Sequence, residues 1–93
     1  MFYYVYVIQS LRDKKFYTGW TNNLVNRIKK HNKGLVISTK YRRPFRLIYY
    51  EACLNKDDAI KREKYLKSAW GKRYLKNRLK NYLTGRGEID IEK

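Results

Sequence analysis

Hydrophobic and polar positions predict a β-hairpin at the start of the chain. Residues 2–9 (FYYVYVIQ) carry aromatic and β-branched side chains on both faces, which is typical of a largely buried strand. A turn is expected at residues 10–13, and residues 15–20 (KFYTGW) predict the returning strand. A four-residue turn would place Tyr6 opposite Tyr17, so we expect two tyrosines side by side on one face of the hairpin.

A helical pattern follows the hairpin. Thr21 or Asn22 can cap a helix that runs to about Asn32, where Lys33 and Gly34 form the stop signal. Four residues at spacings of three, one and three form the stripe that should face the sheet: Leu24, Arg27, Ile28 and His31. An arginine and the only histidine of the chain are therefore expected where apolar residues normally lie.

The second half of the chain predicts a loop, a strand and two helices. Residues 35–46 have no clear periodicity and are expected to form a basic loop, and residues 47–54 (LIYYEACL) predict a third strand. Asn55 with the two aspartates that follow is a helix start, and Gly71 is expected to break the chain before the last helix. The inward stripe of the first of these helices holds Ala59, Glu63, Leu66 and Trp70, and that of the second holds Leu75, Leu79, Tyr82 and Leu83.

These elements predict an α/β (α+β) fold of the order β-β-α-β-α-α, in which helices flank a small three-stranded antiparallel sheet. Residues 1–85 are expected to form a single domain, followed by a flexible acidic tail at 86–93. A chain of 93 residues is about the length of one small domain.

The charge indicates a polyanionic partner. The chain carries 23 Lys and Arg against 8 Asp and Glu, and three of the acidic residues lie in the last six positions. Nucleic acid is the leading candidate because phosphate contacts supply most non-specific affinity. An anionic membrane is the weaker candidate, since no helix here pairs a basic face with a broad apolar one. A merely basic soluble protein is the remaining alternative.

Several classes of protein are excluded or disfavoured. No apolar run approaches the roughly 18 residues of a membrane helix, and the N-terminus does not resemble a secretory signal. One Cys and one His cannot form a zinc finger, which needs four such ligands. A single Cys also fits a reducing cytoplasm, which is the expected location.

The polar residues on predicted inward faces resemble those of the GIY-YIG nuclease family. The segments YVY (4–6) and YTG (17–19) resemble its signature, and Arg27 with His31 resembles its first helix. Glu63 in KREKYLK resembles its metal-binding glutamate. The chain is most similar to small stand-alone members, which resemble the N-terminal nuclease module of the larger excinuclease proteins. Tyr4 replaces the glycine of the first motif, Thr18 replaces the aliphatic residue of the second, and Asn77 is the nearest counterpart of a late asparagine.

The resemblance implies a Mg²⁺-dependent DNA endonuclease. Glu63 would hold one Mg²⁺ or Mn²⁺ ion, and Arg27 would stabilise charge on the phosphate. Tyr6 or Tyr17 would orient or deprotonate the attacking water, with His31 as a relay, and Tyr6 is expected to be closer to that water. Nearby cations would have to lower the pKa of such a tyrosine.

Other cations are expected to contact nucleic-acid phosphates. They lie in the predicted loop and in the last helix: Lys40, Arg42, Arg43, Arg46, Lys72, Arg73 and Lys76. Many family members carry a second DNA-binding domain that this chain has no room for, which leaves open a protein partner that supplies specificity.

Two other functions remain open. The same fold could grip DNA or structured RNA without efficient cleavage. Alternatively, residues 57–80 could form a helix-turn-helix with Gly71 in the turn, although this leaves the inward Glu63 unexplained. Each site residue also has a purely structural explanation: the tyrosines as hairpin aromatics, His31 at a helix end, Arg27 at a protein edge, and Glu63 in a helix pair with Lys67.

Overall fold

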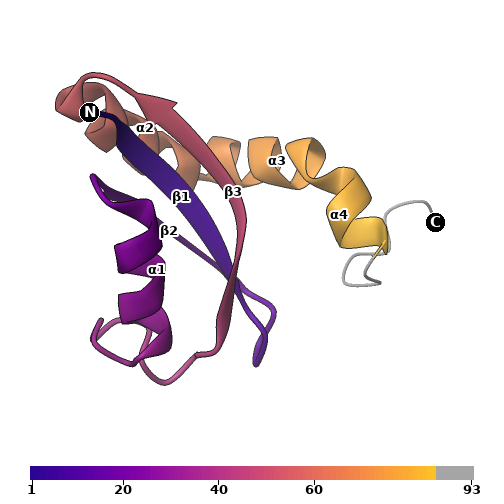
Figure 1. The fold of residues 1–93 in the computed structure, drawn as a ribbon. Helices are drawn as coiled ribbons and strands as arrows, with labels where there is room; N and C mark the ends of the chain where they lie inside the picture. Colours follow the sequence, from indigo (N-terminus) through magenta and orange to yellow (C-terminus); the bar gives the residue numbers. More distant parts are fainter. Residues whose placement is uncertain (86–93) are drawn as a thin grey trace. The chain divides into compact units, whose positions relative to one another are not determined.

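The computed structural model describes residues 1–85 (Figure 1). The chain divides into two compact units, the first from Met1 to Glu63 and the second beginning at Lys64. Each unit is described by itself below. The predicted acidic tail at 86–93 lies outside the described residues.

The first unit is built on a three-stranded antiparallel sheet. Its strands are β1 (Tyr3–Ser10), β2 (Phe16–Thr21) and β3 (Phe45–Cys53), in the order β2-β1-β3. Figure 1 shows β1 between its two partners. The central strand is buried from Val5 to Ser10, as its apolar pattern predicts. This sheet with its flanking helices confirms the predicted fold class.

The pairing of β1 with β2 differs from the predicted register by two residues. Tyr6 lies opposite Gly19, and Tyr17 lies opposite Ile8. The turn is longer than expected because Ser10 organises it: its backbone N–H donates to the carbonyl of Lys15, and its hydroxyl accepts from the N–H of Arg12. A shift of two residues preserves the face on which each side chain lies. Both tyrosines therefore remain on the same face of the sheet.

Helix α1 (Leu24–Asn32) covers that face. Its N-cap is Asn23, whose side chain accepts from the N–H of Asn26. Its end is marked by Lys33 and by Gly34, which has a φ of 78°. The core beneath α1 consists of Tyr6, Ile8 and Phe45, with Tyr17, Leu24, Ile28 and Leu47 packed against them.

The start of β3 is tied to the end of α1. The side chain of Asn32 accepts from the N–H of Phe45 at 2.7 Å and donates to its carbonyl at 3.1 Å. This strand consequently begins two residues earlier than the sequence pattern predicts. Arg46, expected in the loop, is a strand residue opposite Gln9.

Helix α2 (Lys56–Lys67) begins as predicted. The side chain of Asn55 accepts from the N–H groups of Asp57 and Asp58. Arg62 donates to Glu51 of β3 at 2.8 and 2.9 Å. Because Glu51 lies opposite Val5 and not Tyr6, this part of α2 is on the face of the sheet opposite α1.

The predicted break at Gly71 is wrong. Helix α2 ends at Lys67, and α3 (Ala69–Arg78) begins after the N-cap Ser68. Gly71 lies inside α3, where a side chain would overlap the carbonyl of Tyr65 and the backbone of Leu66. Trp70, predicted to face inward, is 68% exposed because the change of direction at Ser68 ends the α2 stripe before it.

A fourth helix, α4 (Lys80–Gly85), completes the described chain. The predicted last helix is therefore two helices separated at Leu79, which caps α3. Within the second unit Leu66, Leu75 and Leu83 are buried, as their spacing predicts. No helix among residues 1–85 is both long enough and apolar enough to cross a membrane.

Candidate active site

Tyr6 and His31 meet in the core between β1 and α1. The hydroxyl oxygen of Tyr6 lies 2.7 Å from Nε2 of His31, and neither side chain has exposed surface. The helical stripe places His31 over the sheet, and the alternation of β1 turns Tyr6 toward it. The structure thus brings together two predicted site residues that are 25 positions apart.

A third polar residue extends this pair. Nδ1 of His31 lies 2.8 Å from Oγ1 of Thr39, which is also fully buried. The Thr39 hydroxyl is 3.4 Å from the carbonyl oxygen of Val36. Thr39 belongs to the segment between α1 and β3, and it was not among the predicted site residues. A single threonine in a loop without periodicity gives no sequence signal.

Arg27 connects this buried chain to the surface. Its Nε donates to the hydroxyl oxygen of Tyr6 at 3.4 Å, and the side chain is half-buried. Arg27 lies one helical turn before His31 on α1, so both reach the same tyrosine. The guanidinium has five N–H donors, and this contact uses one of them.

Burial controls the proton equilibria of the pair. It lowers the pKa of His31 to about 4, with a smaller contribution from the charge of Arg27. Burial also raises the pKa of Tyr6, and the hydrogen bond from Arg27 opposes that shift without overcoming it. The expectation that cations would lower this pKa is therefore wrong. At neutral pH His31 is a neutral imidazole and Tyr6 a neutral phenol.

Tyr17 and Gly19 complete the tyrosine side of the site. The Tyr17 ring lies 5.2 Å from the ring of His31, between centroids, and Tyr17 is half-buried. The expectation that Tyr6 would be closer to water disagrees with its complete burial. Gly19 faces Tyr6 so closely that a Cβ there would lie 2.5 Å from the Tyr6 hydroxyl oxygen. The glycine of the second motif thus makes room for the tyrosine of the first.

Glu63 is half-buried on α2, and its charge raises the pKa of Tyr6. The predicted metal site must be judged by the donors that this glutamate can offer together with its surroundings. Residues 1–85 contain no group of three or more His, Cys, Asp or Glu that could enclose a metal ion. A single carboxylate completed by water and substrate phosphate is a donor set that suits Mg²⁺. Glu63 therefore fits an ion of this kind, and the neutral imidazole of His31 is already engaged with Tyr6 and Thr39.

The predicted cations of the first unit have different surroundings. Arg42 pairs with Asp13 at 2.9 Å and lowers the pKa of that carboxyl. Lys40 lies 5.0 Å from the centroid of the Tyr41 ring. Arg43 and Arg46 are exposed.

The remaining predicted cations lie on α3 in the second unit. Lys72, Arg73 and Lys76 are all exposed. Arg73 lies 5.1 Å from the centroid of the exposed Trp70 ring. Asn77 is also exposed, so this side chain faces solvent.

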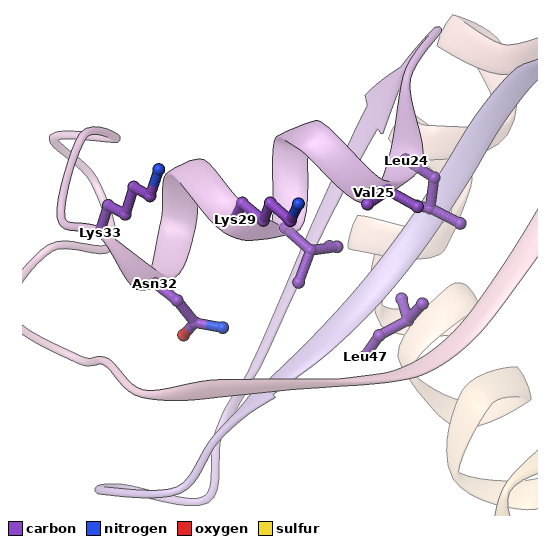
Figure 2. A pocket seen from close by; sticks show the side chains of 7 residues that line it. Leu24, Val25, Lys29, Asn32, Lys33 and Leu47 are labelled. Carbon is purple, nitrogen blue, oxygen red and sulfur yellow. The ribbon is translucent and has the colours of Figure 1, made fainter.

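A groove of about 460 Å³ lies between α1 and β3 (Figure 2). Its lining is mostly apolar, with lysines at the rim, and it contains none of the predicted site residues. The lining residues are Leu24, Val25, Ile28, Lys29, Asn32, Lys33 and Leu47. This groove is therefore separate from the Tyr6–His31 site.

Comparisons with known proteins agree with this arrangement. Residues 2–77 match the family model of the GIY-YIG catalytic domain. A UPF0213 protein of Clostridium perfringens is 48% identical over 65 residues, which are 69% of each chain. A UPF0213 protein of Staphylococcus saprophyticus is 37% identical over 75 residues, covering 80% of this chain and 90% of the relative.

A solved structure is also similar. The solution NMR structure of a UPF0213 protein from Bacillus halodurans is 35% identical, with a TM-score of 0.49. The match covers 95% of this chain and 92% of that one. With the family model spanning both tyrosine motifs, Arg27, His31 and Glu63, the chain belongs to the GIY-YIG family.

Proposed function

We propose that this protein is a metal-dependent endonuclease that hydrolyses DNA phosphodiester bonds. The observation that carries the proposal is the buried Thr39–His31–Tyr6 chain that ends on the half-buried Arg27. Three polar side chains in a small core are a cost to folding unless they are satisfied and useful. A chain that fixes one arginine near the surface is suited to binding a phosphate.

Arg27 is proposed to bind the scissile phosphate. With Nε directed at Tyr6, the two terminal nitrogens of the guanidinium remain to donate to phosphate oxygens in a forked geometry. A permanently charged donor held in place stabilises the negative charge that develops during hydrolysis. Tyr6 and His31 are proposed to position this group and not to meet the water themselves, since both are fully buried.

Tyr17 is proposed to orient the attacking water. It is the more exposed of the two motif tyrosines, and it is on the same face of the sheet as Tyr6. Glu63 would hold one Mg²⁺ or Mn²⁺ ion, which lowers the pKa of a bound water and neutralises phosphate charge when present.

The net charge of +15 supports DNA as the partner. Exposed cations in both units, among them Arg43, Arg46, Lys72 and Lys76, are proposed to contact the phosphate backbone. The site geometry does not select a particular DNA structure.

A non-cleaving nucleic-acid-binding module is the second candidate. The raised pKa and complete burial of Tyr6 favour it, because they remove one of the two tyrosines as a base in contact with water. The two candidates differ in one observable, which is cleavage.

Nicking of supercoiled plasmid, with Mg²⁺ and with EDTA, tests the proposal. We expect nicking that needs the metal and is lost in Arg27→Lys, since lysine cannot reproduce the forked contact. Lys30→Ala, which removes an exposed cation from the same helix, is the matched control and should cleave like the wild type. Tight, salt-sensitive binding without nicking on linear, branched and single-stranded DNA would favour the binding module.

A further inference from the structure

Two hydrogen-bond directions in the buried chain can be assigned from the partners available. The Tyr6 hydroxyl has two partners among the described residues, Nε2 of His31 and Nε of Arg27. The arginine nitrogen can only donate. The hydroxyl proton of Tyr6 must therefore point to His31, whose Nε2 then carries a lone pair and no hydrogen.

The other ring nitrogen follows from this assignment. A neutral imidazole with an unprotonated Nε2 carries its hydrogen on Nδ1. That hydrogen points at Oγ1 of Thr39, 2.8 Å away, and the Thr39 hydroxyl can in turn donate to the carbonyl of Val36. Every proton in the chain then has an acceptor, in agreement with the absence of unsatisfied buried side-chain polar atoms within residues 1–85.

We propose that Thr39 is a positioning residue that selects the Nδ1–H tautomer of His31 and thereby directs the Tyr6 oxygen toward Arg27. With the opposite tautomer, Nε2–H would donate to Tyr6, and neither His31 nor Arg27 could accept the phenol proton. That proton would then compete with Arg27 for space around the oxygen. This inference rests on the proposed function only for its consequence in catalysis, because the tautomer itself is a property of the folded protein.

The segment between α1 and β3 therefore has a second role. It was expected to be a basic loop for nucleic acid, yet Thr39 brings it into the core beside His31. The segment is anchored to the β1–β2 turn, where the Ser10 hydroxyl donates to the carbonyl of Arg42 at 2.5 Å and Asp13 pairs with the Arg42 side chain. These contacts hold Thr39 in place.

Nitrogen-15 NMR of the imidazole ring tests the proposal directly, because the chain has one histidine and its ring signals are unambiguous. At pH 7 the wild type should show a protonated Nδ1 and an unprotonated Nε2. Thr39→Ser should keep this pattern, since it retains the hydroxyl. Thr39→Val, which has nearly the same shape, should populate the Nε2–H form.

Plasmid nicking supplies the second readout. We expect Thr39→Val to lower the rate about tenfold, the effect of losing one hydrogen bond that holds a reacting group, and Thr39→Ser to restore it. A wild-type ring with Nε2 protonated, or a Thr39→Val ring identical to the wild type, would overturn the inference even if the protein is a nuclease. The expected tautomers in a protein that never cleaves DNA would instead overturn the proposed function and leave the tautomer assignment intact.

Discussion

At the scale of single residues, His31 shows how a polar group can be tolerated in a small core. Both of its ring nitrogens have partners, Tyr6 and Thr39, and the rings of Tyr17 and Phe45 pack around it. A charged imidazolium at this place would lose its hydration without a carboxylate to replace it. The site therefore holds the histidine neutral.

This burial predicts a specific pH dependence of stability. The pKa of His31 is about 4 in the folded protein, and in the unfolded chain it returns to the ordinary value of 6.5. The unfolded state therefore binds the proton first, so the contribution of His31 is complete above pH 6.5 and decreases as the pH falls toward 4. Between pH 7.5 and 5 the free energy of unfolding should drop by about 2 kcal/mol.

Urea denaturation at these two pH values checks the prediction, with His31→Gln as the control that has no imidazole to titrate. The carboxyls of Asp13 and Glu51 also have lowered pKa values, yet they lose their contribution only below their ordinary range, so they leave this window nearly unaffected. Equal pH dependence in the two proteins would contradict the burial of a neutral His31.

At the scale of elements, the sequence predicted which residues share a face better than it predicted their exact neighbours. The period-two pattern of β1 and the stripe of α1 place Tyr6, Arg27 and His31 together. The register of β1 with β2 depends on the geometry of the turn after Ser10, which a residue pattern does not reveal. The shift by two residues is harmless to the site because it keeps Tyr6 and Tyr17 on the same face.

The helix boundary at Ser68 has a similar explanation. Glycine is a common breaker, so Gly71 was the obvious candidate. In the structure a serine cap ends the stripe first, and the glycine serves the close packing of α3 on Tyr65 and Leu66. Capping and close approach use the same residue types, and only three-dimensional contacts tell them apart.

Gly19 gives a prediction at the contact between β1 and β2. In Gly19→Ala the new Cβ would meet the Tyr6 hydroxyl oxygen at 2.5 Å and its Cζ at 2.7 Å, so Tyr6 would have to move away from His31. We expect nicking to be lost and the protein to be destabilised by about 1–3 kcal/mol, as for overpacked cores. Gly85→Ala, whose Cβ would meet nothing within 4 Å, is the control for rate and thermal stability. Normal nicking by Gly19→Ala would show that the Tyr6 position is not needed.

At the scale of the whole molecule, the charge predicts how binding responds to salt. The logarithm of DNA affinity should fall linearly with the logarithm of salt concentration, with a slope of about −0.9 for each phosphate neutralised on duplex DNA. Arg43→Gln and Arg46→Gln should each reduce that slope by about one contact, because both side chains are exposed.

Arg42→Gln provides the contrast for the same titration. Its partner is Asp13, so we expect a loss of stability with little change in slope. Fluorescence anisotropy at several salt concentrations measures all three slopes. A slope near zero for the wild type would contradict nucleic acid as the partner.

Glu63 offers the most direct test of the proposed nuclease. Under single-turnover conditions with Mg²⁺ and saturating protein, Glu63→Gln should nick supercoiled DNA at least about a hundredfold more slowly while binding it with nearly unchanged affinity. Asp57→Asn makes the same change of charge at an exposed position of the same helix and should retain wild-type cleavage. Nicking by Glu63→Gln at the wild-type rate would contradict the account, because the carboxylate proposed to hold the metal would then have no part in the reaction.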